Sequence, residues 1–508
     1  MKPRVRPNVT AWILSVNLAA VGFASAQLTW DADGSAGTNP SDGGGAWLGT
    51  ELWWDGAAHT TWNNGTNANT VAIFGNNGAS GTVTLGSGVS AGGLRFDAVT
   101  GSTGYQIGGG TLTLAPNAVI DIRTGASNAG AGDRVRFTST SVLAGSDPTI
   151  SNAVVPASAF ASYASFSGSN TWTGTLTLTG NSTGLFVDTS TANALNTLTA
   201  VNIGSTATLA LNTGTYTVPT LRIGGLGLGS RGSLRFDNGT VNVNSNIVLT
   251  ADGRMSTNAS GVGIINGAIS GNFNLSVNST TDTVNRIALK GDNTFNQLTV
   301  NRGNVQIGVA GVGTSGLGVV NLAGGVAGNP AVISGTGRTK SGLFVSSGMI
   351  SPGDSYGADM GTLTIGVNLN FSGLTTAQTA ASFTVGAAGA GDRINVTNNL
   401  TLDGDGNFNV LFASGYTPTV GDSWTLISWG GTLTQENFSM GDNLRTGADA
   451  DGNEGNLNLA DLTASGYRWN VGLQNGALTV AIVPEPSVAM LSVLAVAGFA
   501  GRRRRCQA

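Results

Sequence analysis

The chain carries one pattern twice, as Phe166-Ser-Gly-Ser-Asn170-Thr-Trp172-Thr-Gly-Thr-Leu176-Thr-Leu178 and as Leu289-Lys-Gly-Asp-Asn293-Thr-Phe295-Asn-Gln-Leu298-Thr-Val300. Both copies read Gly, any residue, Asn, Thr and an aromatic residue, and then enter an alternating apolar and polar run that is typical of a β-strand. The glycine permits a turn, the asparagine is expected to bond its own backbone, and the aromatic residue is expected to cover the edge of a coil. The pattern predicts a fold built from short strands and tight turns.

Short alternating runs recur along the chain, at 82–85, 111–114, 175–179, 240–243 and 363–365. Glycine accounts for 79 of 508 residues and charged residues for only 10%, a composition that some disordered chains share. The strand-like runs, and the Gly, Asn, Asp and Ser between them, favour an ordered β protein instead. No long amphipathic helical pattern stands out after residue 26, so the expected fold class is all-β.

Two all-β architectures are open. A sandwich closes one core per roughly 100–150 residues and would need three or four domains, whereas a solenoid stacks short coils into a core of any length. No Pro-rich linker or charge run divides the chain, and its internal similarity favours the solenoid. Coils of roughly 20–25 residues, stacked about 4.8 Å apart, would form a rod on the order of 100 Å long.

The two copies of the pattern resemble the autotransporter-associated β-strand repeat of bacterial passenger domains. Similar segments lie at 28–31, 53–54, 62–63 and 72–75, and others follow at 350–354, 361–365, 391–396 and 417–426. Passenger domains of this family adopt right-handed parallel β-helices, so the resemblance implies one over residues 81–482, after a Trp-rich cap segment at 27–80. In that family a membrane barrel follows the passenger. Here a sorting tail takes that place, which implies a different export route.

The segment 27–80 contains five of the ten tryptophans, Trp30, Trp47, Trp53, Trp54 and Trp62. Large aromatic side chains can cover the open end of a β-helix, whose exposed strand edges would otherwise pair with other chains. The alternative is a sugar-binding platform, on which the exposed indole faces would stack against carbohydrate. Burial of the indoles would separate the two hypotheses.

The C-terminal tail, residues 483–508, has three parts in fixed order. They are the motif Pro484, Glu485 and Pro486, an uncharged apolar run over 487–500, and the basic stop Arg502, Arg503, Arg504 and Arg505. The apolar run is expected to form a short transmembrane helix, and the arginines should keep its end on the cytoplasmic side. The order resembles the PEP-CTERM sorting signal of Gram-negative bacteria, which implies processing by an exosortase and transfer to the cell surface or extracellular matrix. A plain C-terminal membrane anchor is the alternative.

The N-terminus, residues 1–26, reads as a secretory signal peptide. It has a basic region, an apolar stretch over 11–23, and a small-residue cleavage site with Ala24 and Ala26. Export by the Sec machinery would place the mature chain outside the inner membrane, with the precursor anchored there by its tail. The only cysteine, Cys506, lies in that tail, so the exported part is expected to fold without disulfides.

The charge balance excludes one class of partner. Of the 23 basic and 27 acidic residues, the two terminal segments hold seven and one, which leaves 16 and 26, a net charge of −10. Nucleic-acid binding needs a basic surface, so no nucleic-acid partner is expected.

The residues give little support for catalysis. His59 is the only histidine and would have to serve any hydrolase triad, and no zinc site or cofactor is expected. The segments 227–232 and 311–316 match the dinucleotide-binding pattern G-x-G-x-x-G, but such matches are expected by chance in a chain this rich in glycine.

Carboxylates are the remaining side chains that could form a catalytic or metal-binding site. Asp392 with Arg393, or Asp237 near Arg235, could be drawn into a polysaccharide-cleaving site, although each is equally compatible with a turn. An acidic loop over 449–461 has the alternating oxygen ligands of a calcium site at shifted spacing. No catalytic or metal-binding residue is therefore predicted. We expect a structural or adhesive surface protein, with an extracellular polysaccharide-binding or polysaccharide-degrading protein as the alternative.

Overall fold

The computed structural model describes residues 26–35, 39–100, 104–123, 134–152, 162–182, 184–278, 286–326, 329–354, 359–374, 378–387, 389–447 and 455–485. The predicted signal helix and the predicted tail helix lie outside these residues. Within the ranges just given, no helix has the length and apolar character that a membrane crossing requires.

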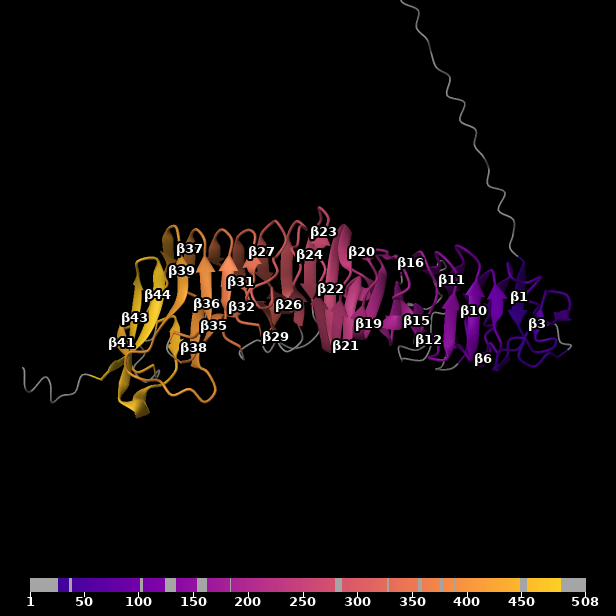
Figure 1. Cartoon of the computed structure of the whole chain (residues 1–508), viewed down its shortest axis with the longest axis horizontal. Helices are drawn as coiled ribbons and strands as arrows, with labels where there is room; N and C mark the ends of the chain where they lie inside the picture. Colours follow the sequence, from indigo (N-terminus) through magenta and orange to yellow (C-terminus); the bar gives the residue numbers. More distant parts are fainter. Residues whose placement is uncertain are drawn as a thin grey trace, which may run out of the picture.

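The expected all-β fold is confirmed for these residues. Strands form an elongated stack (Figure 1), and the helical elements described are three single turns of 3₁₀ helix, η1 (Ala192–Ala194), η2 (Leu228–Ser230) and η3 (Thr463–Ser465). Successive coils pair mainly in parallel register. The sequence separation between paired residues gives the length of a coil. This separation is smaller in the middle of the chain, where Asn202 pairs with Arg222, than near its end, where Leu400 pairs with Leu433, so the later coils are the longer ones. The arrangement is consistent with a β-helix-like solenoid whose later coils exceed the length expected from the sequence.

Three series of parallel pairings run along the stack, here named faces A, B and C. Face A consists of β1 (Gln27–Trp30), β5 (Val71–Phe74), β8 (Gly93–Phe96), β11 (Val119–Ile122), β14 (Thr149–Ser151), β16 (Thr175–Thr179), β18 (Ala200–Ile203), β20 (Thr220–Gly225), the start of β22 (Asn246–Ile265) and β23 (Ile269–Ser270).

Face B consists of β2 (Gly45–Ala46), β6 (Thr82–Thr84), β9 (Gln106–Gly108), β12 (Arg134–Phe137), β15 (Ser162–Phe166), β17 (Leu185–Thr189), β19 (Ala207–Tyr216), β21 (Leu234–Val243), the middle of β22, β24 (Leu275–Asn278), β26 (Leu298–Ile307), β27 (Val320–Ala323), β31 (Leu343–Ser347), β34 (Leu369–Phe371), β37 (Leu400–Asp403) and β40 (Leu433–Glu436).

Face C begins as a separate sheet of β7 (Val89–Ala91), β10 (Gly110–Leu114) and β13 (Ser141–Ala144). It continues through the second parts of β19, β21, β22 and β26 with β25 (Arg286–Leu289), β29 (Asn329–Gly335), β32 (Met349–Pro352), β35 (Gln378–Val385), β38 (Gly406–Phe412) and β42 (Leu457–Leu459). The short β28 (Gly325–Val326) pairs antiparallel with β29.

The core is a set of continuous apolar rows inside the stack. On face A the residues in register with one another are Ala72, Leu94, Ile120, Ile150, Leu178, Ile203, Ile223 and Leu249. All are at most 4% exposed, and full burial of such a side chain contributes about 1.5–3 kcal/mol. Strand alternation turns the residues on either side of each of them outward, so the same periodicity that forms the core also aligns the surface residues.

The repeated asparagine acts between coils, not within its own turn as the sequence led us to expect. Asn170 Oδ1 accepts the backbone N–H of Leu143 in the preceding coil at 2.9 Å, and its Nδ2 donates to Ala194 O in the following coil at 3.1 Å. Asn293 repeats the arrangement, accepting from Ile269 N–H at 2.8 Å and donating to Thr314 O. Both side chains are buried. Each asparagine therefore joins three coils at a turn where strand pairing is interrupted.

The aromatic residue of the pattern also differs from its expected place at a coil edge. Trp172 and Phe295 are both fully buried in the apolar core. The indole Nε1–H of Trp172 donates to Ala194 O at 2.8 Å, the carbonyl that Asn170 also reaches. Burial of a large aromatic side chain is favourable once its one polar group has a partner, so the pattern supplies core volume beneath each turn.

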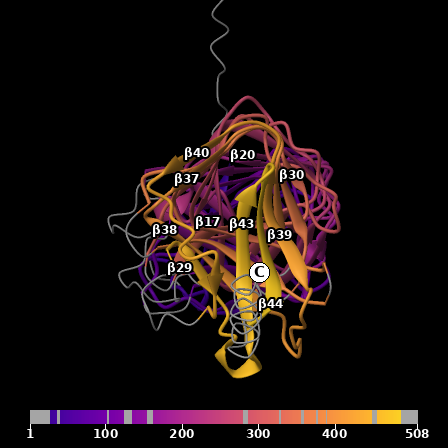
Figure 2. The same ribbon diagram turned by 90° about the vertical axis from the view of Figure 1, so that its left-hand side faces the viewer.

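Pairing departs from the parallel stack at both ends. At the N-terminus, β3 (Trp53–Trp54) pairs antiparallel with β1 and with β4 (His59–Thr60). At the C-terminus, a second sheet of parallel strands, β30 (Arg338–Thr339), β33 (Thr362–Ile365), β36 (Arg393–Val396) and β39 (Ser423–Trp429), gives way to antiparallel β44 (Ala477–Pro484), β43 (Tyr467–Gln474) and β41 (Leu444–Arg445). In the end-on view β43 and β44 lie at the front of the stack (Figure 2).

Tryptophan closes the C-terminal end as well. Trp469 of β43 is fully buried, its ring lies 5.4 Å from Phe412 and 6.0 Å from Trp424, and its Nε1–H donates to Ala460 O at 2.8 Å. The sequence predicts an aromatic cap at the N-terminus alone. The antiparallel hairpin that delivers this second cap carries no repeat pattern, so the cap could not be recognised from the sequence.

We expect Asn293→Ala to lower the free energy of unfolding by about 2–4 kcal/mol, because it leaves a buried N–H and a buried carbonyl without partners. Asn266→Ala is the matched control, since the Asn266 amide bonds Asn244 at 2.8 Å on the exposed surface, and its loss should stay within about 0.5 kcal/mol. Chemical denaturation measures both. Equal effects of the two variants would contradict the inter-coil role of Asn293.

Candidate functional site

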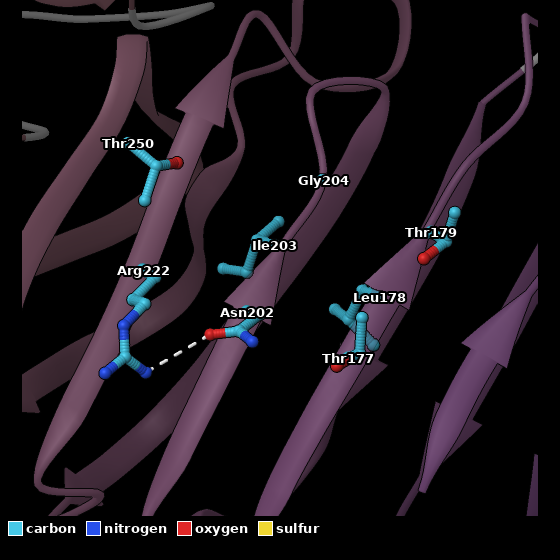
Figure 3. Close-up of a pocket in the computed structure, with 8 residues that line it drawn as sticks. All are labelled: Thr177, Leu178, Thr179, Asn202, Ile203, Gly204, Arg222 and Thr250. Atoms are coloured by element: carbon cyan, nitrogen blue, oxygen red, sulfur yellow. Dashed lines mark hydrogen bonds between the residues drawn. The ribbon is translucent and has the colours of Figure 1, made fainter. Parts of the chain in front are cut away.

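An open hollow lies on the outer surface of face A, over β16, β18 and β20 (Figure 3). Its volume is about 320 Å³. The lining residues are Thr177, Leu178, Thr179, Asn202, Ile203, Gly204, Arg222 and Thr250. Leu178 and Ile203 belong to the buried core row and lie at the base of the hollow, whereas the polar residues come from the outward positions on either side of that row.

Two outward rows make the walls of the hollow. Thr177, Asn202 and Arg222 are in register on consecutive strands and form one row. The second row follows the paired core residues Leu178, Ile203, Ile223 and Leu249, and therefore consists of Thr179, Gly204, Gly224 and Thr250. Neighbouring strands lie about 4.8 Å apart, so consecutive members of a row repeat at that spacing along the rod.

Glycine in the second row creates the space. Gly204 and Gly224 occupy the two positions between Thr179 and Thr250, so two consecutive coils present no side chain there. The strands also pack closely at these points. A Cβ added to Gly204 would lie 2.9 Å from Leu178 O, and one added to Gly224 would lie 2.9 Å from Thr250 Oγ1. Any larger residue would therefore both strain the coil and fill the hollow.

The charge in the hollow comes from Arg222, whose side chain is exposed. Its Nη1 donates to Asn202 Oδ1 at 3.3 Å, as the dashed line in Figure 3 shows. No carboxylate among the described residues lies within 4.0 Å of this guanidinium. The guanidinium lies in the row of Asn202 and Thr177, so the site offers hydrogen-bond donors and one positive charge (Figure 3).

A second hollow of about 390 Å³ lies on the same face toward the N-terminus. It is lined by residues that include Gln27, Val71, Gly93 and Val119, which are the earlier members of the row that leads to Thr177. Here the cations are neutralised. Arg95 pairs with Asp97 at 2.6 Å and Arg123 pairs with Asp121 at 2.5 Å. The two hollows thus share a face and differ in charge.

The N-terminal tryptophans pack against one another. Trp30, Trp47 and Trp53 are fully buried and Trp62 is 3% exposed. The Trp53 ring lies 4.6 Å from that of Trp62, 5.0 Å from that of Trp47 and 5.3 Å from that of Trp30. Four of the five indole faces are therefore inaccessible to a sugar ring, and the geometry favours the capping hypothesis over the sugar-binding platform.

His59 belongs to this cap. Its Nε2 lies 2.6 Å from Asp31 Oδ2, and its ring lies 4.9 Å from the Trp54 ring. Asp31 is 1% exposed and also accepts the backbone N–H of Ser41 at 3.0 Å. His59, the residue that any hydrolase triad would require, thus ties β4 to the end of β1, and this contact is a structural hydrogen bond.

Asp392 and Arg393 do not form a pair. Asp392 is 1% exposed and accepts the backbone N–H groups of Gly361 at 2.9 Å and Thr384 at 2.7 Å. Arg393 points outward and donates to Ser428 Oγ at 2.9 Å. Burial raises the pKa of Asp392 to about 7, and the two backbone N–H groups only partly offset this effect. The carboxylate links two coils from inside and has no access to a polymeric substrate.

Asp237 and Arg235 do contact each other, at 2.5 Å between Oδ1 and Nε. Burial raises the pKa of Asp237, and Arg235 opposes that shift. The guanidinium of Arg235 also lies 5.7 Å from the Phe186 ring centre, within the range of a cation–π contact. The two charges lie side by side on a largely buried face, so this pair is also structural.

Residues 449–454 of the acidic loop at 449–461 lie outside the described residues. Its last carboxylate, Asp461, accepts the backbone N–H of Thr463 at 2.8 Å and its hydroxyl at 2.6 Å, and these bonds lower the pKa of Asp461. Asp461 therefore bonds the first residue of η3. Among the described residues no group of three or more His, Cys, Asp or Glu side chains is placed to hold a metal ion.

Only some of the residues predicted to form the signal cleavage site and the sorting signal lie within the described residues. Ala26 O accepts the N–H of Val71 at 2.8 Å, so β1 starts directly after the predicted cleavage site, whereas Ala24 lies outside the described residues. Pro484 ends β44, and Glu485 bonds Gly466 O through its N–H at 3.1 Å and Arg468 Nη2 through its carboxylate at 2.9 Å. Pro486 and the arginines at 502–505 lie outside the described residues.

Sequence reasoning missed the face-A hollow. Thr177, Asn202 and Arg222 stand on three successive coils, far apart in the sequence, and are neighbours only through strand pairing. No motif marks them or Gly204. The alternation around Leu178, Ile203 and Ile223 could have placed them on one face, but only once the length of each coil was known.

We expect Trp53→Ala to lower the free energy of unfolding by about 3–5 kcal/mol, because it opens a cavity among four aromatic rings at the end of the core. The neighbouring Trp54 is half-buried, so Trp54→Ala should lower it by about 1 kcal/mol or less. Chemical denaturation followed by fluorescence of the remaining tryptophans measures both. Equal losses would show that the buried cluster does not close the core.

The raised pKa of Asp392 predicts a pH-dependent stability. An unfolded Asp releases its proton near pH 3.8, whereas folded Asp392 holds it up to about pH 7, so the folded state binds more protons between these values. The stabilisation from this group is complete below about pH 4 and declines as the pH rises to about 7, by roughly 4 kcal/mol in total. The difference in unfolding free energy between the natural chain and Asp392→Asn should follow this decline in denaturation experiments from pH 4 to 8. A constant difference would contradict it.

Comparison with known proteins gives one local likeness. No protein-family model matches the chain. The chain is 32% identical over 244 residues to the adhesin BmaC autotransporter of Brucella suis biovar 1 (strain 1330). The match covers 45% of this chain but only 6% of that protein. The likeness, together with the β-rich structure, fits an autotransporter-like β-helix.

Proposed function

We propose that the chain is an exported cell-surface or extracellular-matrix protein with an adhesive or structural role. The observation that carries the proposal is the 32% identity over 244 residues to an adhesin autotransporter. A continuous stack of parallel coils supports it (Figure 1), because a solenoid presents a long surface while each coil needs only its neighbours for stability. The proposal includes the right-handed parallel β-helix that the repeat resemblance implies.

A non-enzymatic role is part of the proposal. The carboxylates that a glycoside-cleaving site would need are occupied in the structure, Asp392 by two backbone N–H groups and Asp237 by Arg235. His59 is held by Asp31 in the N-terminal cap. Each of these groups stabilises the fold, and the similarity to an adhesin also supports a non-enzymatic role.

The proposed route to the surface uses both ends of the chain. Residues 1–26 would direct export by the Sec machinery, and the tail from Pro484 would hold the precursor in the inner membrane until an exosortase removes it. The placement of β1 directly after Ala26 and of Pro484 at the end of β44 supports these limits, since processing would leave β1 intact and would take only Pro484, the partner of Tyr467, from β44.

A host strain that lacks the gene tests the role. We expect it to attach to surfaces several-fold less than the parent strain, and the full-length gene to restore attachment. A protease added to intact cells should degrade the protein on the complemented strain, because the rod lies outside. Unchanged attachment of the deletion strain, or full protection from the protease, would contradict the proposed role.

Mass spectrometry of the surface fraction tests the processing separately. We expect no peptide that contains Arg502 to Arg505, because the exosortase would have removed the tail. A surface protein that still ends at Ala508 would favour the plain membrane anchor.

A polysaccharide-binding role is the second candidate. The hollow over β16, β18 and β20 favours it, because its hydroxyl, amide and guanidinium groups suit hydrogen bonding to a sugar chain. This role is compatible with adhesion.

A further inference from the structure

The hollow on face A is a place where the regular surface is interrupted. Along the row between Thr179 and Thr250, Gly204 lines the hollow and Gly224 is buried beside Thr250, so two consecutive coils lack side chains. Two coils correspond to about 10 Å along the rod. A gap of this length matches one or two sugar units of an extended chain and is too shallow to enclose a compact small molecule.

Arg222 gives the gap its chemical character. It stands in the opposite row, bonds the neutral amide of Asn202 at 3.3 Å, and has no carboxylate among the described residues within 4.0 Å. The cations of the second hollow, Arg95 and Arg123, are instead paired with Asp97 and Asp121. A guanidinium presents a planar fork of N–H groups that fits a carboxylate with two parallel bonds. The hollow therefore suits an anionic group better than a neutral one.

The other lining residues narrow the ligand further. None of them is aromatic, so stacking against the apolar face of a neutral sugar is not available in this hollow. Hydroxyls of Thr177 and Thr179 can donate to and accept from sugar hydroxyls, and the Thr250 hydroxyl, which donates to Ile223 O at 3.2 Å, can accept from them. The net charge of −10 outside the terminal segments opposes binding of nucleic acid along the rod, whereas a single arginine can bind one carboxylate locally.

We propose that this hollow binds a uronate unit of an acidic polysaccharide, with the Arg222 guanidinium on the carboxylate and the threonine hydroxyls on the sugar hydroxyls. The bond from Arg222 to Asn202 holds the guanidinium beside the Asn202 amide, in the row that also contains Thr177 (Figure 3). The inference rests on the proposed surface role, to which it adds the class of ligand and the residues that recognise it.

The test compares two forms of one polymer. The full exported chain is measured against immobilised polygalacturonate and against its fully methyl-esterified form, which has the same backbone without charge. We expect binding to the acid and little to the ester. Arg222→Gln should weaken binding to the acid at least tenfold, because it removes a charge-assisted contact. Asn202→Ala should weaken it several-fold, because it frees the guanidinium from its orienting bond.

Arg393→Gln is the matched control. Arg393 is also exposed and bonds a neutral side-chain group, Ser428 Oγ, at 2.9 Å, but it stands on β36, away from the hollow. Its loss changes the net charge of the protein by the same amount, so it should leave binding unchanged. Far-ultraviolet circular dichroism of each variant verifies that the fold is retained, as expected for substitutions of exposed side chains.

Three results would overturn the inference: no binding of polygalacturonate by the natural chain, equal binding of the acid and the ester, or equal affinities of Arg222→Gln and Arg393→Gln. Each leaves the attachment experiment untouched. If the deletion strain loses attachment while one of these results is found, the uronate site is wrong and the surface role stands. If attachment does not change, the surface role fails whatever the polymer binds.

Discussion

Hydrogen bonding between the backbones of successive coils is the constraint on which this structure depends. A parallel coil can satisfy its N–H and C=O groups only through the coils on either side, so each one must keep its neighbours' register. Where a turn interrupts the strands, Asn170 and Asn293 continue the bonding with side-chain amides. At the two ends, where a neighbour is missing, antiparallel strands and buried tryptophans replace it. The repeated pattern is thus a device for keeping coils in register.

The same register builds the surface. Since core residues such as Leu178, Ile203 and Ile223 stack directly, the outward residues beside them stack too, and any type of side chain that recurs becomes a row. A binding site on such a rod arises where a row of surface side chains is interrupted. On face A the interruption is the absence of two side chains at Gly204 and Gly224, with Arg222 across from them.

The sequence was sufficient to predict the fold class because alternation around short apolar runs is a local property. It predicted the closing role of the N-terminal tryptophans for the same reason, as large apolar residues concentrated at one end must be buried somewhere. It did not reveal that Asn170 reaches two other coils, because a side-chain bond to a residue 27 positions earlier leaves no local trace. The Arg222 hollow and the Trp469 cap were missed in the same way, since both depend on which distant residues become neighbours. Asp392 could be read as a catalytic group only while its burial was unknown.

Nearest-neighbour bonding also determines how such a rod responds to force. Each coil is held by the two beside it, so a molecule that is pulled from one end yields one coil at a time. With roughly 20–30 residues in a coil, every released coil adds about 7–11 nm of extended chain. Tension is relieved in small increments instead of reaching a single breaking point. A tether with this property stretches under flow and keeps hold of whatever it has bound.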